Sequence, residues 1–114
     1  MYLSLQKGHP VTLDKVETIA GGLAPPFAGA YTYEHVKKYV DQVVLVSDEQ
    51  IKKAMKVLFK DCKLVVEPSG AAPLAAIMNY EKLGGLAVKG AKICLGLCGG
   101  NISVSDLQKH IESV

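Results

Sequence analysis

Residues 93–101, ICLGLCGGN, decide how the rest of the chain is interpreted. The stretch begins as an apolar run typical of a strand buried on both faces, and it stops at a Gly-Gly pair followed by a polar residue. Ligands of open α/β sheets bind outside the carboxyl ends of the strands, where glycine lets the backbone come close to a flat or charged group. The pattern therefore predicts a strand over residues 92–97 and a binding turn over residues 98–101.

The composition is that of one globular domain at most, or a piece of one. The chain has 114 residues, of which 49% are apolar and 21% charged, and its net charge is +2. These values argue against disorder. All 13 basic residues are lysines, scattered along the chain, so arginine, the best side chain for gripping phosphate or guanine, is absent. We therefore expect no nucleic-acid partner.

The cysteines and the N-terminus predict a cytoplasmic protein. Three cysteines, at positions 62, 94 and 98, suit a reducing compartment better than a disulfide framework. The first residues lack a basic start followed by an apolar core, and no run of about 18 apolar residues occurs, so no membrane segment is expected. The three histidines are too scattered to propose as metal ligands.

Helices are predicted over residues 32–40, 47–60, 70–82 and 103–112. In the first helix the apolar residues are Val36, Tyr39 and Val40. The clearest helix is the second, because Ser47 and Gln50 form a capping-box pattern ahead of one apolar face, which consists of Ile51, Ala54, Met55, Leu58 and Phe59. The third is expected to begin near Pro73 with Ser69 as its cap, and to present Leu74, Ile77 and Met78 as one stripe. Residues 43–46, VVLV, predict a second buried strand. In residues 1–31 frequent proline and glycine leave room for at most a helical turn near residues 13–17.

Four segments in this order resemble a known family. They are TIAGGLAPPFAG (18–29), YVDQVVLVSDEQI (39–51), KLVVEPSGAAPLAAI (63–77) and CGGNIS (98–103). Together they resemble the C-terminal third of the pyridoxal-phosphate-dependent serine/threonine dehydratases, a group that includes serine racemases and has the tryptophan synthase β-like fold. The resemblance implies that residues 1–114 are a single partial domain of α/β class. This would be the C-terminal part of a three-layer, parallel-sheet large domain, with two strands and about four helices.

The resemblance also implies cofactor-binding residues. Cys98 matches the Ser or Cys that hydrogen-bonds the pyridine nitrogen, and Gly99 follows it in the Gly-Gly pair. A neutral thiol cannot hold a protonated pyridinium, so the ring is a weaker electron sink, which suits β-elimination of a hydroxyl better than transamination. Gly22 matches a glycine whose backbone approaches the ring, and Glu67 matches a Glu near it. Glu67 is equally well interpreted as a carboxylate that favours the N-terminus of the following helix.

The chain departs from the family pattern in three places. Gly21 stands where the family commonly has a substrate-facing Asp. The family's cofactor-bearing lysine follows a Ser by two positions, and none of the 13 lysines here does so. A run of three or four glycines for the cofactor phosphate is also absent. No residue of this chain is therefore assigned a catalytic role, and catalysis by the chain alone is not expected.

Three functions stay open at this point. The first is the C-terminal portion of a pyridoxal-phosphate-dependent L-serine/L-threonine dehydratase that converts a small hydroxyamino acid to a 2-oxo acid and ammonia once the missing N-terminal portion is supplied. The second is a non-catalytic binding or assembly module that docks on a full-length relative. The third is a small α/β domain whose Gly-Gly turn binds nothing. Self-association is expected from the incomplete sheet. Family likeness also suggests a potassium or magnesium ion, to which no residue here is matched.

Overall fold

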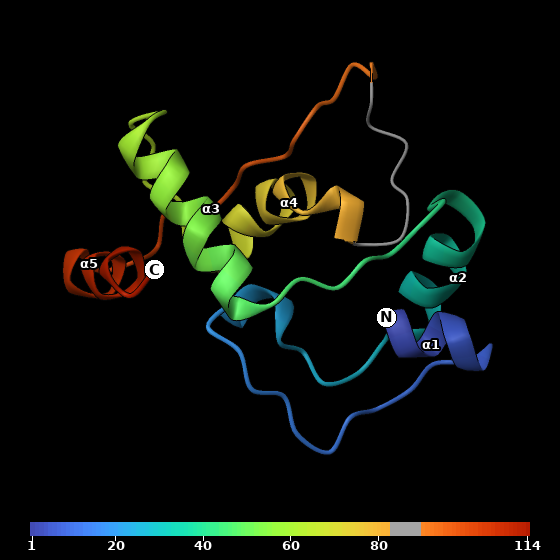
Figure 1. The fold of residues 1–114 in the computed structure, drawn as a ribbon. Coiled ribbons are helices and arrows are strands. Elements are labelled where there is room, and N and C mark those ends of the chain that lie inside the picture. The colour runs from blue at the N-terminus through green and yellow to red at the C-terminus, as the bar shows by residue number, and fades with distance from the viewer. Residues whose placement is uncertain (83–89) are drawn as a thin grey trace.

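The computed structural model describes residues 1–82 and 90–114 of the chain (Figure 1). The described part is mainly helical, and it also contains two short 3-10 helices, η1 (Gly21–Leu23) and η2 (Tyr80–Lys82). Its α-helices are α1 (Tyr2–Lys7), α2 (Ala30–Tyr39), α3 (Asp48–Lys60), α4 (Pro68–Met78) and α5 (Val104–Glu112). No helix among the described residues is long and apolar enough to cross a membrane.

The packing of α3 against α4 forms the centre of the fold (Figure 1). The predicted capping box at the start of α3 is confirmed, because Ser47 Oγ accepts a hydrogen bond from the N–H of Gln50 and the Gln50 side chain accepts one from the N–H of Ser47. The buried face of α3 is also the predicted one, and it consists of Ile51, Ala54, Met55 and Leu58. Phe59, predicted on the same face, is 42% exposed.

The buried residues of α4 are mostly small, and they include Gly70, Ala71, Ala72 and Ala75. In the predicted stripe of Leu74, Ile77 and Met78, Leu74 packs at the edge of the core but Met78 is 45% exposed, so the stripe as a whole is not the buried face. Alanine and glycine let two helix backbones approach closely, which the larger side chains would prevent. The helix also begins earlier than predicted, with Glu67 as its N-cap and Pro68 at its first position, and Pro73 lies inside it.

Helix α5 covers the other side of α3. It begins as predicted, because Ser103 Oγ accepts a hydrogen bond from the N–H of Asp106 at 3.0 Å. Leu107 is 6% exposed and joins the core, with Ile102 and Ile111 packed against it at the edge. This position ties the C-terminal end of the chain to the central helix pair.

The N-terminal segment folds beside α2 and contains the helix that the sequence failed to predict. Helix α1 contacts α2, Ser4 is buried, and its hydroxyl accepts a hydrogen bond from the N–H of Val11 at 3.0 Å. The predicted turn at residues 13–17 is not helical. In α2 the buried side chain is Tyr33, at 2% exposure, whereas the predicted Tyr39 is 67% exposed.

Neither predicted strand forms a ladder with another described residue. Residues 43–46 and 92–97 carry no strand assignment, and Leu45 and Ile93 are 60% and 45% exposed, so neither segment is buried. The β-pairing among the described residues is one antiparallel bridge between Thr12 and Phe27. A strand needs backbone partners on at least one side, and the helices of the described chain cannot supply them. In Figure 1 the orange segment that contains residues 92–97 swings away from the helices.

Candidate cofactor-binding site

Glu67 links the start of α4 to the turn at residues 98–101. Its backbone N–H donates a hydrogen bond to the carbonyl oxygen of Gly99 at 2.8 Å. Its carboxylate oxygen Oε2 accepts one from the N–H of Asn101 at 3.2 Å. The helix N-terminus is where a carboxylate was predicted to be favourable, but the side chain makes no cap bond within α4. The carboxylate instead holds the Gly-Gly turn.

Two glycines let the turn approach the helix. Gly99 has a φ of 77°, a conformation that favours glycine, and a β-carbon there would collide with the side chain of Glu67. A β-carbon on Gly70 would collide with the carbonyl oxygen of Cys98 and lie 2.8 Å from Val66 Cγ1. The turn and the first turn of α4 are therefore in backbone contact. The sequence predicted a close backbone approach at the Gly-Gly pair, but gave no sign that Gly70 is its counterpart.

Gly22 reaches the same cluster from the N-terminal side. Its N–H donates a hydrogen bond to Ser69 Oγ at 2.8 Å. A β-carbon on Gly22 would lie 2.9 Å from that oxygen and 3.9 Å from Glu67 Oε1. Ser69 was predicted as the cap of α4, and that prediction is wrong, because its hydroxyl binds the Gly22 loop and Glu67 occupies the cap position.

Cys98 lies on the open side of the turn. The three cysteines are free, and each is exposed. Cys98 lies at the edge of a shallow hollow of ≈ 270 Å³, which is lined by Leu64, Val65, Val66, Leu97, Cys98, Gly99 and Gly100. Aliphatic side chains, bare glycine backbone and one thiol form a lining that suits the nitrogen edge of a flat heterocycle. The donor set therefore fits the pyridine side of pyridoxal phosphate.

Two larger hollows lie along α2 and α5, and the second adjoins the Cys98 hollow at Val65. One, of ≈ 430 Å³, is lined by Glu34, His35, Lys37, Lys38 and Tyr39 along α2. The other, of ≈ 400 Å³, is an apolar groove beside α5 whose lining includes Phe59, Val65, Ile102, Val104, Leu107 and Ile111. Neither contains any of the four predicted cofactor-binding residues. The candidate site is therefore defined by its hydrogen bonds and glycine contacts, not by the size of a hollow.

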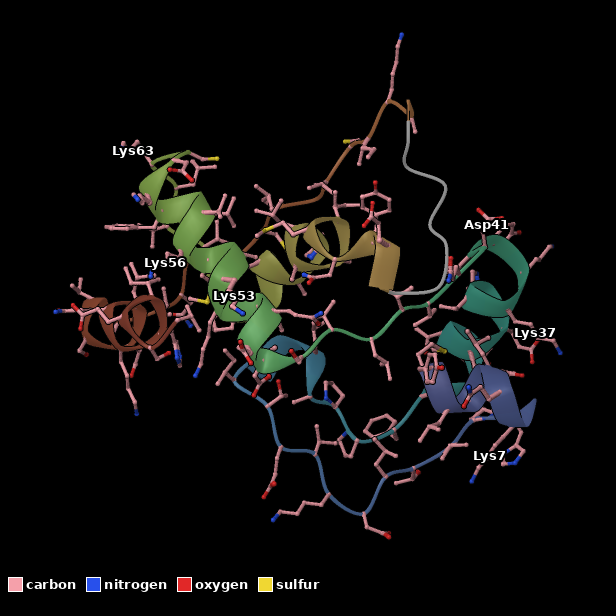
Figure 2. All side chains as sticks on the ribbon, in the orientation of Figure 1. Lys7, Lys37, Asp41, Lys53, Lys56 and Lys63 are labelled. Carbon is pink, nitrogen blue, oxygen red and sulfur yellow. The ribbon has the colours of Figure 1, made fainter. Side chains whose placement is uncertain are left out.

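The lysines labelled in Figure 2 lie on helices or turns away from the 98–101 turn. Of those labelled in Figure 2, Lys7 and Lys37 are on α1 and α2, and Lys53 and Lys56 are on α3. The charged side chain that bonds to the turn is Glu67, an anion. Among the described residues no group of three His, Cys, Asp or Glu side chains is placed to hold a metal ion. The described half-site thus presents backbone, a hydroxyl, a thiol and a carboxylate.

The four predicted residues therefore come together. Glu67 is hydrogen-bonded to the turn of Gly99 and Asn101, and Gly22 is hydrogen-bonded to Ser69, two residues after Glu67. Cys98 lies beside them because it precedes Gly99 in the turn. Sequence reasoning missed the linking roles of Ser69, Gly70 and Asn101. These three residues connect the 18–22 loop, the start of α4 and the 98–101 turn.

Comparison with known proteins identifies the family of this chain. Residues 1–99 match the model of the family described as pyridoxal-phosphate dependent enzyme, and the chain belongs to that family. It is 38% identical over 112 residues to an L-threonine ammonia-lyase of Thermotoga maritima, covering 98% of this chain and 27% of that protein. It is 37% identical to a serine racemase of Dictyostelium discoideum, covering 97% of this chain and 34% of the relative.

Solved structures give the same result. The structure of maize serine racemase matches with a TM-score of 0.83 and 35% identity, covering 98% of this chain and 34% of that one. The processed form of threonine deaminase isoform 2 from Solanum lycopersicum matches with a TM-score of 0.81 and 32% identity, covering 97% and 32%. The α/β class predicted from the sequence is that of these enzymes, while the sheet layers stay a prediction. The chain spans about a quarter to a third of the length of these relatives.

Proposed function

We propose that this chain is the C-terminal portion of a pyridoxal-phosphate-dependent ammonia-lyase that acts on L-serine or L-threonine. It supplies the ring-nitrogen side of the cofactor site, and the N-terminal portion of the enzyme, which this sequence does not include, supplies the rest. The observation that carries the proposal is that Glu67 joins the turn of Cys98 and Gly99 to the start of α4, with Gly22 alongside. Three segments of the family resemblance thus meet at the start of α4, at Glu67 and Ser69.

Each residue has a defined task in this proposal. Bound pyridoxal phosphate supplies an electron sink for bond breaking at the amino acid α-carbon. The Cys98 thiol would hold the nitrogen side of the ring, and a thiol there in place of a carboxylate would not keep that nitrogen protonated, which would suit loss of a β-hydroxyl. Gly22 and Gly99 let the loop and the turn approach Ser69 and Glu67, because a β-carbon at either glycine would meet those side chains. Glu67 holds the turn in place through Asn101.

A missing N-terminal portion is part of the proposal for two reasons. The relatives are about three to four times as long as this chain, and none of its lysines fits the family's cofactor-bearing position. The exposed Leu45, Val65 and Ile93 also lie on segments without strand pairing among the described residues, and such segments are suited to pairing with strands of that portion.

The proposal is tested by reconstitution. The chain is coexpressed with the portion of the Thermotoga maritima L-threonine ammonia-lyase that precedes the matched region, and purified with pyridoxal phosphate. We expect the pair to form a complex that releases 2-oxo acid and ammonia from serine or threonine, whereas each part alone does not. A stable complex without product would favour the assembly module instead, and failure to form any complex would contradict both.

A cysteine pair supplies the matched control. Cys94 and Cys98 are both exposed and four residues apart, but only Cys98 lies at the glycine turn. In the reconstituted complex Cys98→Ala should lower kcat and weaken cofactor retention, Cys98→Ser should restore both in large part, and Cys94→Ala should leave them unchanged. Equal effects of the two alanine variants would remove Cys98 from the site.

A further inference from the structure

The loop at residues 18–22 has no regular structure over most of its length, yet it is fastened to two helices. At its start Thr18 Oγ1 donates a hydrogen bond to Asp48 Oδ1 at 2.5 Å, and the N–H of Ile19 donates one to Asp48 Oδ2 at 3.1 Å. Asp48 is the first residue of α3. Both oxygens of one carboxylate are therefore used to hold the loop.

The far end of the loop is held by α4. Gly22 donates its N–H to Ser69 Oγ at 2.8 Å, and Ser69 is the second residue of that helix. Between the two attachments Ala20 is 1% exposed and belongs to the core cluster. Figure 1 shows η1 beside the start of α3, and η1 also packs on α4. The loop thus spans the starts of the two central helices.

Gly22 lies so close to Ser69 that a side chain at this position would not fit without a shift. A β-carbon at Gly22 would already lie 2.9 Å from Ser69 Oγ and 3.1 Å from Ser69 Cβ. Ser69 and Glu67 are two residues apart at the start of α4, and Glu67 holds the opposite turn through Asn101. One helix start therefore sets the positions of both sides of the candidate site.

We propose that Asp48 and Ser69 are positioning residues, which fix the 18–22 loop beside Glu67 and the 98–101 turn before the remaining portion of the fold is present. Their functional meaning rests on the proposed function, but their structural role belongs to these residues alone. The half-site is then preorganised, and the remaining portion packs on a surface that is already formed.

The test measures amide hydrogen exchange of the isolated chain by NMR. Ser69→Ala should speed exchange of the Gly22 amide about fivefold, the change expected when one hydrogen bond is lost. The core amide of Met55 should keep its rate. Ser69→Thr, which retains a hydroxyl, should restore protection at Gly22. Ser113→Ala is the control, because Ser113 Oγ donates only to the carbonyl of His110, at the end of α5.

A second pair of variants tests the other attachment. Asp48→Ala should speed exchange at Ile19 about fivefold or more, because a charged acceptor is lost. Glu49→Ala removes a neighbouring acid from the same first turn, so it equally weakens the interaction with the helix dipole, but it should leave Ile19 unchanged. Unchanged exchange at Gly22 in Ser69→Ala and at Ile19 in Asp48→Ala would overturn the proposal. Faster exchange throughout the core would also overturn it.

Reconstitution adds a functional readout. In the complex, the double variant Asp48→Ala/Ser69→Ala should retain pyridoxal phosphate at least about fivefold more weakly, because a loosened loop lowers the fraction of binding-competent protein. The pair Glu49→Ala/Ser113→Ala should match the unmodified chain. Cofactor retention unaffected by the double variant would refute the positioning role in binding, even if the exchange results held. If no complex forms at all, the proposed function fails while the exchange results still stand.

Discussion

The carbonyl oxygen of Cys98 lies over the α-carbon of Gly70, so close that a β-carbon does not fit between them. Two segments 28 residues apart in the sequence thus meet backbone to backbone at the candidate site. Substitution of Gly70 by alanine must therefore displace either the turn or the helix.

Gly70→Ala should destabilise the chain by about 2 kcal/mol or more, although alanine is favoured over glycine in helices by about 1 kcal/mol. Urea unfolding measures the change. Gly96→Ala is the matched control, because a β-carbon at Gly96 meets no atom within 4 Å. Its free energy of unfolding should differ little from that of the parent. A stable Gly70→Ala chain with an unshifted Cys98 carbonyl resonance would contradict the contact.

Glu67→Ala should release the turn without unfolding the helices. Loss of the carboxylate leaves the N–H of Asn101 without its acceptor, at a cost of about 1 kcal/mol. Exchange of the Asn101 amide should quicken severalfold, and Glu67→Gln, which keeps one acceptor oxygen, should quicken it less. Glu34→Ala, on the exposed side of α2, is the control. If Asn101 exchanged at the same rate in all four chains, Glu67 would not hold the turn.

Truncation of two adjacent residues of α3 to alanine should change the free energy of unfolding by very different amounts. Leu58 is 2% exposed in the core, whereas its neighbour Phe59 is 42% exposed. Leu58→Ala should cost about 2–5 kcal/mol of unfolding free energy because it removes buried methyl groups and leaves a cavity. Phe59→Ala should cost less than about 1 kcal/mol, although it removes a larger side chain. Equal costs in urea titrations would mean that the face of α3 is assigned wrongly.

The pKa of Glu49 should depend on its ion pair with Lys53. The hydrogen bond from Lys53, at 2.6 Å, lowers the pKa of Glu49 below its ordinary value of 4.5. A carboxylate whose folded pKa is lowered contributes stability above its unfolded pKa, and loses it as the pH falls through the folded pKa. Lys53→Gln should return the Glu49 pKa toward 4.5 in an NMR titration. No change would show that the pair is not formed in solution.

The sequence predicted helices where local signals are strong. The Ser47–Gln50 box and the Ser103 cap are patterns contained within four residues, so α3 and α5 could be placed from them alone. The buried face of α4 could not, because apolar periodicity favours large side chains, and here close helix packing selects alanine. The strand at residues 43–46 was predicted from composition, but strand formation depends on partners that no local pattern contains.

The candidate site was predicted by resemblance at Cys98, Gly99, Gly22 and Glu67, and these residues do converge. Their role in cofactor binding stays a prediction. What holds them together could not be predicted, because the roles of Gly70 and Ser69 depend on contacts with residues 28 and 47 positions away. A serine near a helix start is usually interpreted as a cap, and only the fold shows that its hydroxyl is engaged elsewhere.

The interior between α3 and α4 is built largely from alanine, a side chain with a single methyl group. Such an interior removes little apolar area from water per residue, so the isolated chain keeps a small thermodynamic margin. Any molecule that binds only the folded form widens that margin in proportion to the logarithm of its concentration. The melting temperature of this chain therefore becomes a gauge of occupancy, and it can be used to screen for the polypeptide that completes it without any assay of turnover.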